Sequence, residues 1–501
     1  MTVVVVGAGP VGVAAALLLA RRGVDVLVLD RHAAVYPQPR AVHLDDESLR
    51  VLQAAGVADA FAAVSRPMAG LRLLDGAHRT LVEFRRGPGV HGWPQASMFT
   101  QPDLEALMRA ELAGEPRARL RGGCELLHVE QRDGSVRVVL RDLATREDEE
   151  VDADAVLGCD GANSTVRRLI GARMRDLGPT ERWLVVDLES VEPLDVWPGV
   201  HQVCDPARPA TFMPVAGSRY RAEFRLADDE TAADLDLPVQ LACFGAAGAQ
   251  VVRTAEYSYA AQVADRWRNG RVLLCGDAAH LTPPFIGQGL GLGLRDAHQL
   301  AWKLAAVLAG GDEELLDTHQ AERAPHAAAL IRVAVLLGRL MTGGGRGAAV
   351  VRRLALGRVR RLPGLSDFTL GSRTPPLRRG RLVRRPRFVP GSPVGALVPQ
   401  PTVAVDGMRV RLDDVLGEGW AVLTAGGPVP ALADAAGVRV LRLGDGPGEL
   451  ACPELVRWLR GRSVLVRPDR IVAAATPSFP AIMARRWRRP ARSRRVATDT
   501  P

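Results

Sequence analysis

The 501-residue sequence lacks several features that would assign it to particular classes of protein. No two of its six cysteines form a C-x-x-C pair, which excludes a dithiol redox motif and a zinc ribbon. We therefore expect reduced, structural cysteines and no metal site. No apolar run reaches the roughly 18 to 20 residues that a membrane span needs. We therefore expect no membrane partner.

The N-terminus lacks a secretory signal, because MTVVVVGAG has no basic segment and runs directly into a glycine-rich turn. We therefore expect a cytoplasmic protein. Lysine is nearly absent, since Lys303 is the only one, and arginine supplies the other basic side chains behind the net charge of +9. Seven arginines lie at 485–495. Such a cluster can attract phosphates, but a solvated tail explains it more simply, so we expect no nucleic-acid partner.

The hydrophobic pattern predicts a parallel βαβ unit at the start of the chain. Residues 3–6 and 24–30 are apolar, strand-like runs, separated by a glycine-rich turn and an apolar helical stretch. A helix is expected over 103–114, with Asp103 as its cap. The later pattern predicts strands over 124–157, a separate sheet over 180–264, a buried strand at 272–277, a helix over 289–309, further helices to about 355, and a small α/β unit over 393–476.

The first chemical motif is Gly7-x-Gly9-x-x-Gly12, between the first strand and the first helix. Gly7 permits a tight turn, Gly9 lets the backbone approach a pyrophosphate, and Gly12 lets the helix pack closely on the strand. Pro10 opens the helix, whose N-terminus faces the phosphates. Asp30 ends the second strand, where a carboxylate can accept hydrogen bonds from ribose hydroxyls. These residues predict a dinucleotide site without distinguishing FAD from NAD.

Two later strand-loop-helix segments favour a flavin. One contains Gly158-Cys-Asp160-Gly, followed by Asn163 or Ser164 as a helix cap, and the other begins Cys275-Gly276-Asp277. In an open parallel sheet such strand ends line the ligand crevice, so we expect Asp277 to contact the ribitol or the pyrophosphate.

The second of these segments continues into a glycine-rich helix start. Glycines 287, 289, 291 and 293 would let the backbone lie against a flat ring. The helix N-terminus near Gly289 and Leu290 would present N–H groups to the N1/C2=O edge of a flavin, where the reduced ring carries negative charge.

With these motifs in order, the sequence resembles the class A flavoprotein monooxygenases, or aromatic hydroxylases, most closely the 3-(3-hydroxyphenyl)propionate hydroxylase branch. PRAVHLDDESLR, FTQPDLEALM and VRPDRIVAA carry the resemblance along almost the whole chain. It implies an α/β fold with a Rossmann-like FAD-binding domain, an inserted β-sheet substrate domain and a C-terminal thioredoxin-like domain lacking C-x-x-C. The implied boundaries are 1–177 with 266–355, 178–265 and 393–480, with a linker at 356–392 and a basic tail at 481–501.

The resemblance implies a monooxygenase that uses FAD, NAD(P)H and O2 to hydroxylate a phenolic aromatic substrate through a C4a-hydroperoxyflavin. Only one GxGxxG motif is present, so the pyridine nucleotide is expected to bind transiently. A homodimer is compatible with the family. Two alternatives remain: a Baeyer–Villiger or epoxidising monooxygenase acting on a polyketide, and a non-catalytic FAD-binding protein.

Family roles transfer position by position. Arg221 of the middle sheet and His43 are the catalytic candidates, against the simpler interpretations of a solvated strand arginine and a polar loop histidine. His280 is expected to support its loop, and Asp45–Asp46 to cap a helix. After the Gln-Gly pair the family often has Met/Tyr-Asn-Ser-Gly, where this chain has Leu290-Gly-Leu-Gly. Cofactor contacts are implied for Gly7, Gly9, Pro10, Gly12, Asp30, Arg31, Arg40, Gln101, Asp160, Gly276, Asp277, Pro284, Gly287, Gln288, Gly289 and Leu290.

Overall fold

The computed structural model describes residues 1–37, 40–344, 374–384, 391–426, 438–446 and 448–476. The expected basic tail, most of the expected linker and the helices expected after 344 lie outside the described residues. The chain divides into two compact units. The first comprises 1–301 with 319–375, and the second comprises 302–318 with 376–501.

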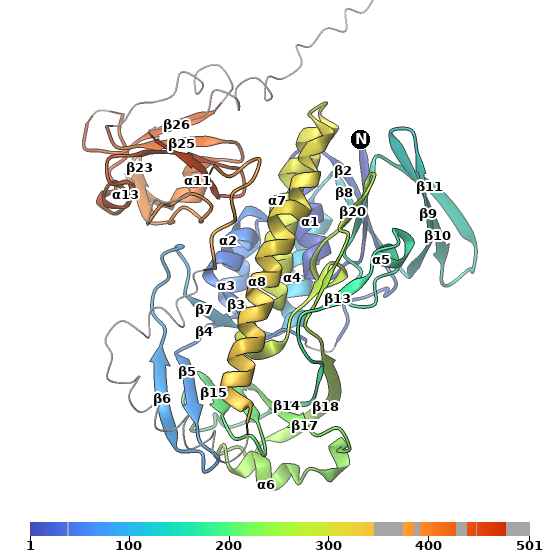
Figure 1. Ribbon diagram of the computed structural model, residues 1–501, viewed down its shortest axis with the longest axis vertical. Coiled ribbons are helices and arrows are strands. Elements are labelled where there is room, and N and C mark those ends of the chain that lie inside the picture. The colour runs from blue at the N-terminus through green and yellow to red at the C-terminus, as the bar shows by residue number, and fades with distance from the viewer. Residues whose placement is uncertain (38–39, 345–373, 385–390, 427–437, 447, 477–501) are drawn as a thin grey trace, which may run out of the picture. The chain divides into compact units, whose positions relative to one another are not determined.

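A six-stranded sheet organises the first unit (Figure 1). Its central strand is β1 (Thr2–Val6), which pairs in parallel with its two neighbours. The apolar β-branched runs are fully buried, as expected of a parallel sheet whose two faces are both covered. The strand order is β20 (Arg268–Asn269), β21 (Val272–Leu274), β12 (Ala155–Gly158), β1, β2 (Asp25–Asp30) and β8 (Ala118–Gly122).

The predicted βαβ opening is confirmed. Helix α1 (Pro10–Ala20) connects β1 to β2 and is buried along almost its whole length, as its run of alanine and leucine requires. A proline at its start fits the first turn, where a backbone N–H has no partner inside the helix. The carboxyl ends of β1, β12 and β21 meet at one edge of the sheet, because these strands are parallel. That edge carries all three predicted motifs.

A seven-stranded sheet is the second large sheet of the first unit (Figure 1). One face packs Leu184, Phe212 and Phe224 against Phe244, which follows α6 (Leu237–Ala242). The opposite face carries Trp183, Arg221 and other residues that alternate with this core along each strand. The order is β18 (Gln250–Tyr259), β14 (Glu181–Glu189), β17 (Arg219–Leu226), β16 (Ala210–Pro214), β15 (Val200–Val203), β5 (Gly70–Leu74) and β6 (Thr80–Arg85).

Three smaller sheets and several helices complete the first unit. The strands predicted over 124–157 are present, and so is the long helix α7 (Gly289–Leu308). The small sheets contain β9 (Cys124–Arg132), β10 (Ser135–Asp142) and β11 (Asp148–Ala153); β13 (Met174–Asp176), β19 (Gln262–Ala264) and β22 (His280–Leu281); and β3 (His43–Asp45), β4 (Arg66–Pro67) and β7 (Ala96–Met98). The other helices are α2 (Asp46–Ala54), α3 (Ala58–Val64), α4 (Gln101–Gly114), α5 (Thr165–Leu169) and α8 (Asp317–Thr342), with short 3-10 turns at Ala232–Asp234, Gly276–Ala278 and Pro284–Ile286. The last residues of α7, the 3-10 turn Glu313–Leu315 and the first two residues of α8 belong to the second unit.

Two predicted caps are confirmed and one is wrong. Asp45 caps α2 by accepting from the Ser48 backbone N–H at 2.8 Å, and Ser164 caps α5. Helix α4, however, begins at Gln101 rather than 103, with Thr100 as its cap. Asp103 therefore lies inside the first turn, where its carboxylate still favours the helix N-terminus.

One helical stretch, Glu313–Thr342, is long and apolar enough to cross a membrane by length and composition. A third of its most apolar window is buried inside the protein. Ala327 and Ile331 on this stretch are fully buried in the core of the first unit, next to Trp267. Packing in that core accounts for these two residues, whereas Val333, Leu336 and Leu340 on the same helix are exposed.

The second unit has a four-stranded mixed sheet and its own core. Strand β25 (Ala421–Thr424) is parallel to β26 (Arg439–Arg442) and antiparallel to β27 (Ser463–Val466), which pairs with β28 (Val472–Ala475). The strands and the helix predicted over 393–476 are therefore present. The unit also contains β23 (Thr402–Val405), β24 (Met408–Arg411), α11 (Leu412–Leu416) and α13 (Pro453–Leu459).

Candidate functional site

The glycine-rich turn after β1 is built for close backbone approach. Gly7 has φ +104°, a conformation that side chains disfavour, and a Cβ there would overlap the Cys159 backbone. A Cβ at Gly12 would overlap the Gly7 carbonyl oxygen. At Gly9 a Cβ would meet no protein atom within 4 Å. Gly9 therefore borders open space at the N-terminus of α1, where a pyrophosphate fits.

Asp30 holds the turn and remains able to bind a ribose. Its two carboxylate oxygens accept from the backbone N–H groups of Ala8, at 2.6 Å, and His32, at 2.7 Å. Each carboxylate oxygen has a further lone pair, so these bonds leave acceptor capacity. Arg31, also predicted to contact the cofactor, is exposed beside it.

Helix α4 brings a polar face to the same turn. The Gln101 amide oxygen accepts from the Ala41 N–H at 2.8 Å, and the Gln101 amide group donates to Glu105 at 2.7 Å. One turn further, Arg109 donates to the Ala8 carbonyl at 3.2 Å. The buried Nε of Arg109 has no hydrogen-bond partner among the described residues. Arg109 thus places a positive charge beside the phosphate-binding turn, although the sequence motifs did not indicate it.

Asp160 supports the start of α5, the helix that Ser164 caps. One of its oxygens accepts from the backbone N–H groups of Thr165 and Val166, at 2.7 and 3.1 Å, and the other accepts from the Ser164 hydroxyl. Arg167, on the same helix, donates to the Ala278 carbonyl at 3.1 Å. The Asp160 loop and the Asp277 turn are therefore joined at the sheet edge.

Asp277 lies in the 3-10 turn that follows β21, and its side chain is exposed. Nevertheless, the surrounding protein raises the pKa of this carboxyl by desolvation, while the charges of His280 and Arg40 act in the opposite direction. The Asp277 carboxyl is thus accessible from outside but partly surrounded by protein atoms. Such a carboxyl suits a contact to a polar cofactor. Arg40 is also exposed, and because its charge acts on the Asp277 carboxyl, the two predicted cofactor residues lie near each other.

Behind Asp277, a buried network fixes the turn. Asp296 on α7 accepts from His280 Nε2 at 2.7 Å, from Arg323 Nε at 2.7 Å and from the Gly276 N–H at 3.2 Å. His280 and Asp296 are fully buried. The prediction that His280 supports its loop is therefore confirmed.

The predicted flavin-edge segment lies at Pro284–Leu290. Gly287 adopts φ +59°, and a Cβ there would meet Nδ1 of His43, so glycine is required on two grounds. His43 Nδ1 lies 3.3 Å from the Gly287 carbonyl oxygen. Burial and the charge of Arg86 lower the pKa of His43 to about 4. The imidazole is therefore neutral near pH 7, and Nδ1 must carry the proton because a carbonyl can only accept.

Two of the four glycines expected against a flat ring have another role. A Cβ at Gly291 would meet the Ser48 hydroxyl and Arg295, and one at Gly293 would meet Val11 and the Gly276 backbone. These two glycines allow α7 to pack closely on α1 and α2. The expectation of ring contact is therefore wrong for Gly291 and Gly293, while Gly289 has no protein atom closer than 3.8 Å to an added Cβ.

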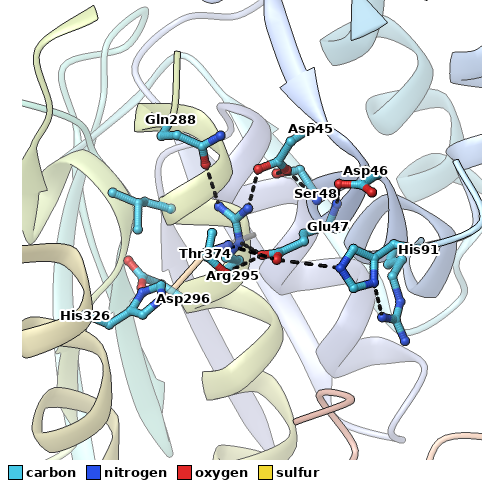
Figure 2. Close-up of polar contacts among 12 residues, drawn as sticks. Asp45, Asp46, Glu47, Ser48, His91, Gln288, Arg295, Asp296, His326 and Thr374 are labelled. Carbon is cyan, nitrogen blue, oxygen red and sulfur yellow. Dashed lines mark hydrogen bonds and ion pairs between the residues drawn. The ribbon is translucent and has the colours of Figure 1, made fainter. Parts of the chain in front are cut away.

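Arg295 connects the flavin-edge segment to the start of α2 (Figure 2). Its guanidinium pairs with Asp45, with Glu47 at 3.0 Å, and with the Gln288 amide oxygen at 3.1 Å. Glu47 also accepts from the Thr374 hydroxyl at 2.7 Å. Arg295 holds the pKa of Asp45 well below its usual range, despite complete burial. This network positions Gln288, whose side chain bonds to both Arg295 and Asp45.

Asp46, the first residue of α2, differs sharply from its neighbour Asp45. Burial, together with the charges of Asp45 and Glu47, raises its pKa to about 8. In the unfolded chain the same carboxyl ionises near 3.8, so the folded state retains a proton that the unfolded state loses at neutral pH. Its contribution to stability is therefore fully present below about pH 4 and is lost as the pH rises to about 8.

Replacing Asp46 with asparagine, which mimics the protonated acid, is expected to stabilise the protein increasingly with pH. The difference in free energy of unfolding between Asp46→Asn and wild type should grow in favour of the variant by about 1.4 kcal/mol per pH unit between roughly pH 5 and 7. Urea unfolding at several pH values measures this difference. Asp148→Asn, at an exposed ion pair, is the control. A pH-independent difference for Asp46→Asn would show that Asp46 ionises normally in the folded protein.

Arg221 is almost completely buried, with 2% of its side chain exposed. It donates to Asp187 at 2.8 Å and to the Arg40 carbonyl at 2.6 Å. Arg221 thus connects the seven-stranded sheet to the loop that carries Arg40 and His43. The simpler interpretation, a solvated strand arginine, is wrong.

The site fits FAD, with open space at Gly9, an enclosed acid at Asp277 and a helix start at Gly289. No group of three or more His, Cys, Asp or Glu side chains in the described ranges is arranged to hold a metal ion. All six cysteines are free.

The family described as FAD binding domain matches residues 1–334, which include every residue that the sequence predicts to contact the cofactor. The chain belongs to this family. A second match, to the HcaD C-terminal domain, covers residues 395–445 of the second unit. The cofactor is therefore FAD.

Three similar proteins illustrate the relationship. A 3-(3-hydroxy-phenyl)propionate/3-hydroxycinnamic acid hydroxylase of Mycobacterium sp. (strain JLS) is 37% identical over 84% of this chain and 75% of the relative. A probable NADH-specific resorcinol 4-hydroxylase of Rhodococcus jostii (strain RHA1) is 34% identical over 85% and 79%. Aklavinone-11 hydroxylase, whose crystal structure contains FAD and aklavinone, superposes with a TM-score of 0.78 at 26% identity, covering 97% of this chain and 98% of that chain.

Proposed function

We propose that this flavoprotein is an NAD(P)H- and O2-dependent monooxygenase that hydroxylates a phenolic aromatic substrate, and that His43 binds the phenol. The observation that carries the role of His43 is its buried Nε2, which has no hydrogen-bond partner in the described part of the chain. Because Nδ1 donates to Gly287, Nε2 is an acceptor. It can accept the phenolic O–H next to the flavin-edge segment, which makes the ring more electron-rich.

When bound, FAD accepts hydride from NAD(P)H and activates O2. The protein has to bind, orient and keep water out. Gly9 and the start of α1 would hold the pyrophosphate, Asp277 the ribitol, and the Gly287–Leu290 backbone the isoalloxazine ring. Arg31, Arg40, Gln101, Asp160, Gly276 and Pro284 are proposed as further cofactor contacts or supports of those contacts.

Arg221 is proposed as a positioning residue. Its guanidinium bonds to Asp187 and to the backbone of Arg40, three residues before His43. Around it, Val42, Met98 and Met213 form an apolar cluster that keeps water away from the loop. Arg221 would therefore act on the reaction through the position of the Arg40–His43 loop.

A substrate screen tests the proposed function. Purified FAD-loaded protein is given hydroxyphenylpropionates, dihydroxybenzenes and polycyclic phenols with NADH or NADPH, and substrate-stimulated oxidation is measured with product identification. A hydroxylated ring is the expected product. An inserted ester oxygen or an epoxide would instead identify the Baeyer–Villiger or epoxidising alternative, and failure to consume NAD(P)H with any phenol would indicate a non-catalytic protein.

Replacing His43 with phenylalanine is expected to lower kcat/KM for the phenol by about ten- to a hundredfold, because one buried hydrogen bond to the substrate is lost. FAD content should be unchanged, and more of the consumed NAD(P)H should appear as H2O2. His201→Phe is the matched control, since His201 is a partly buried histidine beside Trp197 in the seven-stranded sheet. Equal kcat/KM values for wild type and His43→Phe would exclude a role for His43 in phenol binding.

Further parts of the proposal concern the second unit, the substrate domain and the cellular location of the enzyme. The strand order of the second unit, β26-β25-β27-β28 with the first pair parallel, supports a thioredoxin-like domain. The absence of C-x-x-C from the sequence supports a structural role for it, or a contact in a homodimer. We propose that residues 178–265 form the substrate domain, and that the enzyme is cytoplasmic and acts without nucleic acid or membrane.

A further inference from the structure

Glu223 is a buried acid that the proposed reaction does not yet use. It lies in the middle of β17 with 7% of its surface exposed. Its neighbours on the adjacent strands are Val185 and Thr211, neither of which carries a charge. Fully buried glutamates are rare unless paired, so the position requires an explanation.

No hydrogen-bond donor reaches the Glu223 carboxyl within the described ranges. The Arg221 guanidinium is 3.9 Å away and makes its short contacts to Asp187 and the Arg40 carbonyl instead. The Thr211 hydroxyl donates to Gln202 at 3.1 Å. Burial raises the pKa of Glu223. Apart from this long ion pair with Arg221, the largely buried carboxyl has no polar partner among the described residues, an arrangement that costs free energy.

The face of the sheet that carries Glu223 meets the flavin-edge segment. Glu223 is two residues from Arg221 on the same strand, so both project from the same face. Trp183, also on this face, contacts Phe285 edge-to-face, with ring centroids 5.9 Å apart. Phe285 lies two residues before Gly287, whose carbonyl binds His43. Two buried acceptors, His43 Nε2 and the Glu223 carboxyl, therefore belong to the elements that enclose this region.

We propose that Glu223 receives a second hydroxyl group of the aromatic substrate, so that the enzyme selects rings with two hydroxyls. This inference rests on the proposed function, in which His43 takes the first hydroxyl. A hydroxyl can donate to a carboxylate or accept from a carboxylic acid, so it satisfies Glu223 in either protonation state. A methyl group at the same place would leave the buried acid unpaired, which is how sites of this kind reject analogues.

The test compares resorcinol with 3-methylphenol, which replaces one hydroxyl with a methyl group of similar size. Dissociation constants are measured on the oxidised FAD-loaded enzyme, from changes in flavin absorbance and tryptophan fluorescence, without NAD(P)H. Wild type is expected to bind resorcinol at least about tenfold more tightly. Glu223→Leu should reduce this preference about tenfold or more, and Glu223→Gln, which keeps hydrogen-bonding atoms, should retain most of it.

Glu189→Leu, at an exposed position on the neighbouring strand β14, is the control and should leave the preference unchanged. If Glu223→Leu fails to bind FAD or to fold, Glu223→Ala replaces it, judged by the same ratio. An unchanged ratio in a folded leucine or alanine variant overturns the inference, as does a wild type that prefers 3-methylphenol or binds neither compound. Failure of this inference can be told apart from failure of the proposed function. The ratio of dissociation constants is measured without turnover, whereas failure of the proposed function appears as a lack of NAD(P)H consumption.

Discussion

Alanine at Gly12 is expected to destabilise the protein even without FAD, whereas alanine at Gly9 should spare the apo-protein and weaken FAD binding. At Gly12 the new Cβ would overlap the Gly7 carbonyl, so α1 would have to move away from β1. Such overpacking costs about 1 to 3 kcal/mol, which lowers the melting temperature of a domain this size by several degrees. At Gly9 the Cβ meets no protein atom, and φ is −71°, which alanine adopts readily.

The two variants are compared by thermal unfolding of apo-protein and by titration with FAD. Gly9→Ala should unfold within about 0.5 kcal/mol of wild type and bind FAD at least about tenfold more weakly, since its Cβ projects into the space for the pyrophosphate. Gly23→Ala is unsuitable as a control because Gly23 has φ +81°. Gly87→Ala, where an added Cβ meets nothing and φ is not positive, is suitable. Wild-type affinity of Gly9→Ala for FAD would exclude Gly9 from the phosphate site.

The parts of the site that the sequence predicts well depend on local chain geometry. The turn at Gly7, the start of α1 at Pro10 and the cap at Asp45 each depend on residues within a few positions of one another. The cap of α4 was also available locally, since Pro102 in Thr-Gln-Pro-Asp favours the first helical turn and makes Thr100 the cap. The prediction of Asp103 as the cap was wrong because it did not take Pro102 into account. The face formed by Gln101, Glu105 and Arg109, at helical spacing, was likewise available and would have indicated Arg109.

The parts that could not be predicted depend on contacts between distant segments. Glycines 291 and 293 look like a ring-binding run, yet what they meet is set by the packing of α7 on Ser48 and Val11. Arg295 finds Asp45 and Glu47 about 250 residues earlier in the chain. Strand β5, at Gly70–Leu74, joins the seven-stranded sheet by parallel pairing with β15, and nothing in its own sequence indicates that partner.

Replacing Arg295 with methionine is expected to destabilise the protein more than alanine at Gly12 does. It would leave the buried carboxylates of Asp45 and Glu47 without their cation, a loss that costs about 3 to 5 kcal/mol. It would also release Gln288 at the flavin edge, so the absorbance spectrum of bound FAD should shift. Urea unfolding and the flavin spectrum measure the two effects separately.

The pH dependence of the stability deficit in Arg295→Met shows whether the unpaired carboxylates cause it. In wild type, Arg295 lowers the pKa of Asp45, so this carboxylate stabilises the fold above its unfolded pKa and loses that contribution as the pH falls. Without Arg295, burial raises the pKa of Asp45 against only the hydrogen bonds from Ser48 and Gln288, so the folded variant should take up a proton at a higher pH than wild type. The stability deficit of Arg295→Met should therefore be large at pH 8 and shrink towards pH 5. Arg141→Met removes an exposed pair with Asp148 and should cost less than about 1 kcal/mol at every pH. A deficit in Arg295→Met that does not change with pH would mean lost packing, rather than two unpaired buried charges, is the cause.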